Sequence, residues 1–152
     1  MVATPSSQTK RAQESLRRRD ILKWPHLLVR GTWELARARL AMSSIEARDI
    51  EPLNMSTKLC AERVNSAKPG PDQIRRICFV LTHLSQLVPW RSDCVPQALA
   101  AQRWLGAKGI ASEIRIGVEN PKDGEFGAHA WLIHDDRVLI GGEIDQYSVL
   151  IG

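Results

Sequence analysis

The sequence is poor in cysteine and has no long apolar run. Its 152 residues include three cysteines, Cys60, Cys78 and Cys94, an odd set without the paired short spacings of a zinc finger or a disulfide framework. Charged residues interrupt the most apolar stretch, so no run of about 18 apolar residues is available for a membrane span. The first twenty residues are polar and lack the apolar core of a secretory signal. These absences predict a protein of the reducing cytoplasm.

Internal repeats are absent as well, and the composition is that of a globular chain. Hydrophobic residues make up 43% of the sequence and charged residues 25%, which argues against a disordered or fibrous protein. The length suits one domain with a core of its own. We expect a disordered basic tail over residues 1–15 and a single domain over 16–152, helical over 21–108 and forming a sheet over 110–151.

The positive charge is concentrated at the N-terminal end. Up to Ala41 there are nine basic and three acidic residues, a net charge of +6, which leaves −2 for the rest of a chain whose total is +4. A basic arm can bind nucleic acid or an anionic surface. Short charge runs usually only solvate a chain end, so we expect no nucleic acid among the partners.

Apolar residues recur with helical spacing through the first two thirds of the chain. This pattern predicts a long amphipathic helix within Ile21–Ile45 that starts near Pro25, and a shorter helix over Ser56–Ala67. A largely buried helix follows from Pro71 to Val88. A further helix opens near Cys94, with Ser92 as its N-cap, and ends at Gly106 and Gly109.

The period changes from helical to alternating after Gly109. Residues 110–118 alternate between apolar and polar, and residues 127–134 and 137–140 are typical of two further strands around a turn at Asp135-Asp136. Helices followed by a meander of three strands predict an α+β fold with an antiparallel sheet, not a doubly wound one.

Cys94 is the most informative residue of the sequence. With Ser92 as N-cap, it would be the second residue of its helix, where free backbone N–H groups and the helix dipole both favour a thiolate. Pro96 fits the same first turn, because proline is tolerated there and hardly anywhere later. Cys60 and Cys78 lie inside helices without a cap, base or glycine beside them, and we interpret them as packing residues.

A cysteine nucleophile needs a base, and His129 is the best of four histidines. It lies in the middle of a strand, and its small neighbours Gly127, Ala128 and Ala130 leave room for another group to approach the ring. His26 and His83 fall in helical segments and His134 lies beside the turn. Alternation places His129 and His134 on opposite faces, and no other group has the spacing of metal ligands, so we expect no metal.

A cysteine at a helix N-terminus, about 35 residues before a histidine on a strand, is the arrangement of papain-like and transglutaminase-like enzymes. The chain resembles the transglutaminase-like cysteine protease of lasso-peptide biosynthesis in its stand-alone form. The segments that carry this resemblance are Pro89–Ala101, Gly109–Val118, Ala128–Leu132 and Arg137–Ile140. The likeness is strong from Pro89 to about Tyr147.

The resemblance implies a thiol protease that removes the leader from a ribosomal precursor peptide before macrolactam closure. It implies Cys94 as nucleophile, His129 as base, water as cosubstrate and no cofactor. The implied partners are the precursor peptide, a lasso cyclase and a separate leader-recognition protein, because residues 1–41 show no strand pattern of a recognition domain.

The family also places an aspartate on the strand after the hairpin, and here this chain departs from the pattern. The expected position is occupied by Gly141. A hairpin with three loop residues would pair Ile133 with Arg137 and place His129 opposite Gly141, where no side chain could orient the ring.

Glu143 is our candidate for the orienting carboxylate. Alternation would place it on the face of His129, within reach across a diagonal of roughly 7 Å. Asp145 shares that face one step further away, and Asp135 and Asp136 are most simply turn formers. A plain solvated carboxylate is the equally open interpretation of Glu143.

Two other functions remain open from the sequence. Acyl transfer to an amine, as transglutaminases perform it, uses the same residues and differs only in the acceptor. A non-catalytic module that binds a peptide or nucleic acid through the basic helix is the alternative from another class. Such a module would have no need for a capped cysteine and an isolated strand histidine.

Overall fold

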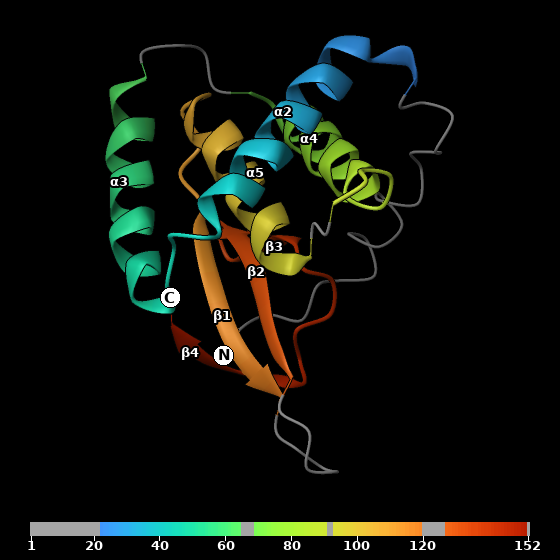
Figure 1. The fold of residues 1–152 in the computed structure, drawn as a ribbon. Coiled ribbons are helices and arrows are strands. Elements are labelled where there is room, and N and C mark those ends of the chain that lie inside the picture. Colours follow the sequence, from blue (N-terminus) through green and yellow to red (C-terminus); the bar gives the residue numbers. More distant parts are fainter. Residues whose placement is uncertain (1–21, 65–68, 91–92, 120–126, 152) are drawn as a thin grey trace.

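The computed structural model of the protein describes residues 22–64, 69–90, 93–119 and 127–151. The tail expected over 1–15 and the proposed N-cap Ser92 lie outside the described residues. The elements are α2 (Pro25–Ala41), the 3-10 helix η2 (Ala47–Asp49), α3 (Ile50–Arg63), α4 (Pro71–Leu84), α5 (Cys94–Gly106), β1 (Glu113–Glu119), β2 (Ala128–His134), β3 (Arg137–Ile140) and β4 (Tyr147–Ile151). Helices come first and strands follow (Figure 1), which confirms the predicted α+β class.

Proline marks two of the helix starts, as the sequence predicts. Pro25 and Pro71 occupy the first turns of α2 and α4, where a missing N–H costs no hydrogen bond. The helix predicted over Ser56–Ala67 instead starts earlier, at Ile50, because η2 leads directly into it. No helix among the described residues is both long and apolar enough to cross a membrane.

Glycine ends α5 in the expected way. The helix stops at Gly106, and Gly109 has a φ of +79°, a left-handed conformation that favours glycine. The N–H of Ile110 then donates to the carbonyl of Leu105 at 3.0 Å, which satisfies one of the last free carbonyls of the helix. The chain therefore leaves α5 through a tight turn and runs into β1.

The sheet has four antiparallel strands in the order β3-β2-β1-β4, one more than predicted. The extra strand β4 pairs with β1, with Glu119 opposite Tyr147, so the chain crosses from one edge of the sheet to the other after β3. Strand β1 begins at Glu113 rather than Ile110. The three-strand meander was therefore incomplete.

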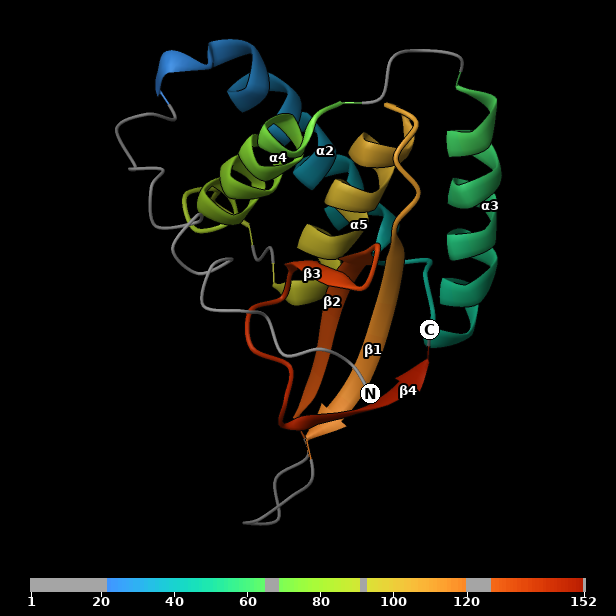
Figure 2. The ribbon, with the colours of Figure 1, turned by 180° about the vertical axis from the view of Figure 1, so that it is seen from behind.

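The helices α2, α4 and α5 lie on one face of the sheet, with α5 packed against β2 and β1 (Figure 1). The view from behind shows the other face, which no described helix covers (Figure 2). The main core lies between helices and sheet and includes Leu35, Ile77, Leu81, Leu99, Leu105, Ile114 and Leu132, all nearly inaccessible to solvent. This core fixes α5, and hence its N-terminal end, relative to β2.

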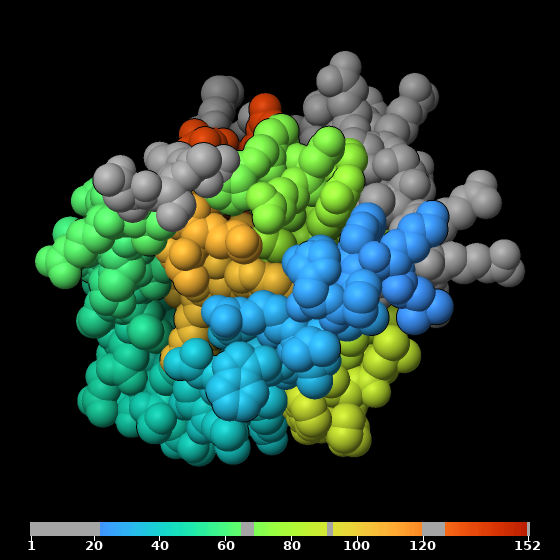
Figure 3. Space-filling model, turned by 90° about the horizontal axis from the view of Figure 1, so that it is seen from above, coloured from blue at the N-terminus to red at the C-terminus, as the bar shows by residue number. Residues whose placement is uncertain are grey.

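Helix α2 has an inner and an outer apolar face. Leu27, Leu35 and Ala38 are buried in the core. Val29, Trp33 and Leu40 form an outer stripe with 58% to 76% of their surface exposed, on a helix that lies open at the surface in the view from above (Figure 3). Helix α2 therefore packs against the core on one side and leaves an exposed apolar stripe on the other.

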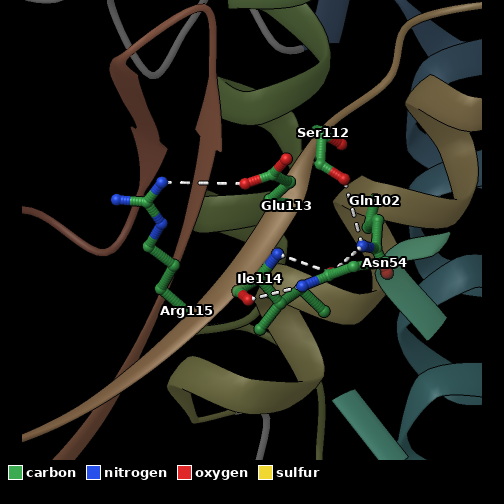
Figure 4. A network of polar contacts seen from close by, with 6 residues as sticks. All are labelled: Asn54, Gln102, Ser112, Glu113, Ile114 and Arg115. Atoms are coloured by element: carbon green, nitrogen blue, oxygen red, sulfur yellow. Dashed lines mark hydrogen bonds and ion pairs between the residues drawn. The ribbon is translucent and has the colours of Figure 1, made fainter. Parts of the chain in front are cut away.

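A polar network fastens α3 to α5 and to β1 (Figure 4). Asn54 Oδ1 accepts from the Ile114 N–H at 2.9 Å and from Gln102 Nε2 at 2.6 Å, and Asn54 Nδ2 donates to the Ile114 carbonyl at 3.0 Å. Gln102, which is fully buried, also donates to the Ser112 carbonyl at 3.1 Å. The network satisfies backbone groups at the start of β1 that water cannot reach.

Candidate active site

Cys94 is the first residue of α5, and its side chain is half-buried. The residue before it, Asp93, has extended backbone and occupies the N-cap position, so the prediction of Ser92 as cap and Cys94 as second residue was off by one. The consequence for chemistry is the same. A side chain at the first position lies beside free N–H groups and the positive end of the helix dipole, which favour an anion.

The other two cysteines have different surroundings. Cys60 is exposed on α3, so its prediction as a packing residue was wrong, whereas Cys78 is buried in α4. Burial raises the pKa of the Cys78 thiol to about 12, because the thiolate would lose its hydration. Cys78 is therefore a packing residue, as predicted.

We expect iodoacetamide at neutral pH to label Cys94 fastest and Cys78 last. The thiolate is the reacting form, and burial raises the pKa of Cys78 so far that its thiol stays protonated at neutral pH. Mass spectrometry of peptides after timed labelling measures the three rates, with urea-unfolded protein as the control in which the order should vanish. Labelling of Cys60 ahead of Cys94, or of Cys78 ahead of Cys60, in the folded protein would contradict this expectation.

His129 is the second residue of β2 and is held on three sides. Its Nε2 lies 2.7 Å from the carbonyl oxygen of Gly141. The ring stacks on Tyr147, with centroids 4.9 Å apart, and more loosely on Trp131 at 6.2 Å. A carbonyl oxygen only accepts, so Nε2 carries the proton and the Nδ1 lone pair of the neutral ring is left as the base.

The His129 ring shares its sheet face with Trp131 and Tyr147. Leu132, on the other face of β2, belongs to the core formed with the helices. In the part of the chain that the structure describes, no hydrogen bond joins the Cys94 thiol to this ring. The elements α5 and β2 pack together, whereas strand alternation places the ring on the face of β2 away from the core that α5 helps to form.

Two of the remaining histidines lie within hydrogen-bond distance of main-chain carbonyls. Nδ1 of His83 lies 2.9 Å from the Phe79 carbonyl one helical turn earlier, and Nδ1 of His134 lies 2.6 Å from the Ala111 carbonyl. His26 is exposed on α2. Among the described residues, no group of three or more His, Cys, Asp or Glu side chains could hold a metal ion.

The hairpin between β2 and β3 differs from the predicted one. Its loop has two residues, Asp135 and Asp136, with φ values of +46° and +59°, and His134 pairs with Arg137. Positive φ at both positions is the type I′ turn that suits the twist of a two-residue hairpin. The prediction of a three-residue loop, with Ile133 opposite Arg137, was therefore wrong.

The observed hairpin determines where the candidate carboxylates lie. Asp135 and Asp136 form the turn, as expected. Strand β3 ends at Ile140, and Gly141 is followed by a second residue of positive φ, so strand alternation does not extend to residue 143. Glu143 is exposed beyond the end of β3, and its role stays a prediction.

Sequence reasoning missed the immediate surroundings of His129. The acceptor for Nε2 is a main-chain atom, and Tyr147 reaches the ring from β4, the strand that was not predicted. The Gly141-Gly142 pair directly after an apolar strand was the available signal, because adjacent glycines mark backbone that passes close to other groups.

Comparison with known proteins gives one match. Residues 35–152 match the family model of the transglutaminase-like superfamily. No curated protein and no solved structure matches the chain. The match covers α5 and the whole sheet, so it includes both Cys94 and His129. The chain belongs to the transglutaminase-like superfamily.

Proposed function

We propose that the protein is a cysteine peptidase that removes the leader from a ribosomally made lasso-peptide precursor before the macrolactam closes. The observation that carries this proposal is Cys94 at the first position of α5 within a transglutaminase-like domain. The superfamily includes cysteine proteases and acyltransferases, and the flanks of Cys94 and His129 resemble those of the leader peptidases.

In the proposed reaction, the Cys94 sulfur attacks the carbonyl carbon of the scissile amide while His129 Nδ1 takes the thiol proton. His129 then gives this proton to the leaving amine, the C–N bond breaks, and an acyl-enzyme remains. Water attacks the thioester and restores the thiol. The Cys94 N–H is the proposed donor to the oxyanion, and the neighbouring Trp90, whose buried indole N–H has no acceptor in the described ranges, is the candidate second donor.

This chemistry needs the thiol and the ring within hydrogen-bond reach. No hydrogen bond joins them in the described structure and the ring lies on the outer face of β2, so the proposal requires the start of β2 to rearrange and bring the ring to the end of α5 when the precursor binds. A peptide laid along the end of α5 would supply the binding energy for that step.

The direct test is incubation of the protein with the precursor encoded nearby and the leader-recognition protein, followed by mass spectrometry. Hydrolysis adds one water across two fragments. Transglutaminase-type transfer would instead join the acyl fragment to an amine and lose the leaving group. Two free fragments support the peptidase, a joined product would replace it with the acyltransferase, and an unchanged precursor would contradict both.

The partner that we propose for the outer stripe of α2 is the leader-recognition protein. Val29, Trp33 and Leu40 supply the apolar centre of such an interface, and the exposed Arg37 beside them favours an acidic rim on the partner. The proposed place of action is the cytoplasm, where precursor, recognition protein and cyclase would meet.

Cleavage is expected to depend on that partner. The recognition protein should raise the rate at low precursor concentration, because it increases the local concentration of the leader. Trp33→Glu should remove most of this increase and leave the basal rate within about twofold, since Trp33 is remote from α5's first turn in sequence and exposed. Leu59→Glu, at an exposed position of α3, is the matched control. Equal rates with and without the partner would contradict the assignment.

Glu143 is proposed to support the His129 imidazolium from beyond the end of β3. We expect Glu143→Gln to lower the single-turnover rate by no more than about tenfold, because an exposed carboxylate is screened by water and salt. Asp145→Asn and Asp135→Asn are the controls. A fall in one of the aspartate variants with a normal Glu143→Gln protein would overturn this role, and normal rates in all three would leave a Cys94–His129 dyad.

A further inference from the structure

The position at which the family carries an aspartate is occupied here by main chain. The carbonyl oxygen of Gly141 lies 2.7 Å from Nε2 of His129, a distance typical of a good N–H···O hydrogen bond. This contact satisfies one ring nitrogen, and because a carbonyl oxygen only accepts, it fixes the proton on that nitrogen.

Only glycine fits at residue 141 in this backbone. Its φ is +121°, a conformation that side chains rarely adopt. A Cβ added there would lie 2.9 Å from the Cα of Trp131 and would overlap its Cβ. Gly142, in contrast, has a φ of +69° and nothing within 4 Å of its added Cβ. Of the two glycines, only Gly141 therefore lies close to β2. This close approach orients the Gly141 carbonyl toward His129.

Tyr147 closes the other side of the ring. It stacks on His129 with an interplanar angle of 28°, and its backbone is fixed by pairing with Glu119 of β1. A ring that is stacked on one face and hydrogen-bonded at Nε2 has few orientations left.

We infer that Gly141 is the positioning residue of the site, whose carbonyl does for His129 what a carboxylate does in a triad. The inference rests on the proposed function only in naming His129 as the base. The carbonyl sets the tautomer and the ring orientation, but it adds no full negative charge beside the imidazolium.

The test is NMR spectroscopy of protein labelled with ¹⁵N-histidine, at a pH where His129 is neutral. We expect the His129 proton on Nε2, protected from exchange with water and visible as a downfield signal. Gly141→Ala should lose this protection and lower the single-turnover cleavage rate by about a hundredfold. Gly142→Ala should keep the protected signal and cleave within about threefold of the wild-type rate. Circular dichroism and the melting temperature show whether each variant is folded.

A second variant keeps the inference testable if Gly141→Ala does not fold. Tyr147→Leu removes the stacking partner and should speed exchange of the Nε2 proton, whereas Tyr147→Phe should not. A proton on Nδ1 in the wild-type protein, or an unprotected Nε2 proton, would overturn the inference. These signals come from proteins that keep His129, and they can be recorded without turnover. If His129→Ala cleaves normally, that result contradicts the proposed function alone, and the NMR test of the inference can still be made.

Discussion

Replacement of Cys94 by alanine is expected to abolish precursor cleavage and to leave the fold intact. Alanine removes the only thiol at a helix N-terminus in the described structure, and with it the nucleophile of the proposed reaction. Loss of a nucleophile typically costs a factor of about 10⁴ or more in the rate of chemistry. Because the Cys94 side chain is half-buried and lies at the end of α5, its removal should cost little stability.

The measurement is single-turnover cleavage followed by mass spectrometry, with the melting temperature as the check on folding. Cys60→Ala is the matched control, since Cys60 is exposed on α3. Cys78→Ala should also cleave, although it opens a small cavity in the core and should melt earlier. Wild-type turnover by the Cys94→Ala protein would end the proposed mechanism.

Replacement of Asn54 by leucine is expected to have the largest effect on stability. Leucine has a similar volume but leaves the Ile114 N–H and carbonyl without the partners that they have at 2.9 and 3.0 Å, and it takes one acceptor from Gln102. Unpaired buried polar groups cost about 1–3 kcal/mol each, so we expect a loss of about 3 kcal/mol after partial relaxation. This corresponds to a fall in melting temperature of about 6–12 °C.

Ser56→Ala is the control for this prediction, because Ser56 is exposed on the same helix and makes only a local hydrogen bond to the Leu53 carbonyl. Its melting temperature should change by less than about 2 °C. The double variant Asn54→Leu, Gln102→Leu should lose less than the sum of the two single losses, because the residues share one network. A normal melting temperature for Asn54→Leu would show that the network contributes nothing.

The helices were predictable because their ends carry local signals. Proline in the first turn and glycine after the last turn act through the backbone of one or two residues, so Pro25, Pro71 and Gly109 could be interpreted without tertiary information. The strand β4 could not, because Val149 and Leu150 are both exposed and no alternation marks a buried face.

The residues of the candidate site were predictable by type but not by geometry. Cys94 could be recognised as a candidate nucleophile by its position at the start of a helix, and His129 as a candidate base by its small neighbours. The hairpin register depends on positive φ at two consecutive aspartates, which turn statistics assign more readily to Asn-Gly or Asp-Gly. An irregularity between Leu132 and Ile133 then shifts the pairing again. The acceptor for His129 is a main-chain carbonyl, and main-chain atoms have no signature in a sequence.

The close approach of Gly141 to Trp131 limits which residues a mutation can place at position 141. One base change converts a glycine codon into an aspartate codon, yet an aspartate at 141 would meet the Trp131 side chain and a backbone φ of +121°. The atoms in the way are the Cα and Cβ of Trp131 and the carbonyl oxygen of Ala130, so a smaller side chain at 131, short of glycine, would leave the same obstacle. Only a different path of the main chain after β3 would make room for a side chain at 141, so the backbone at this point, and not the size of its neighbour, restricts the residue to glycine.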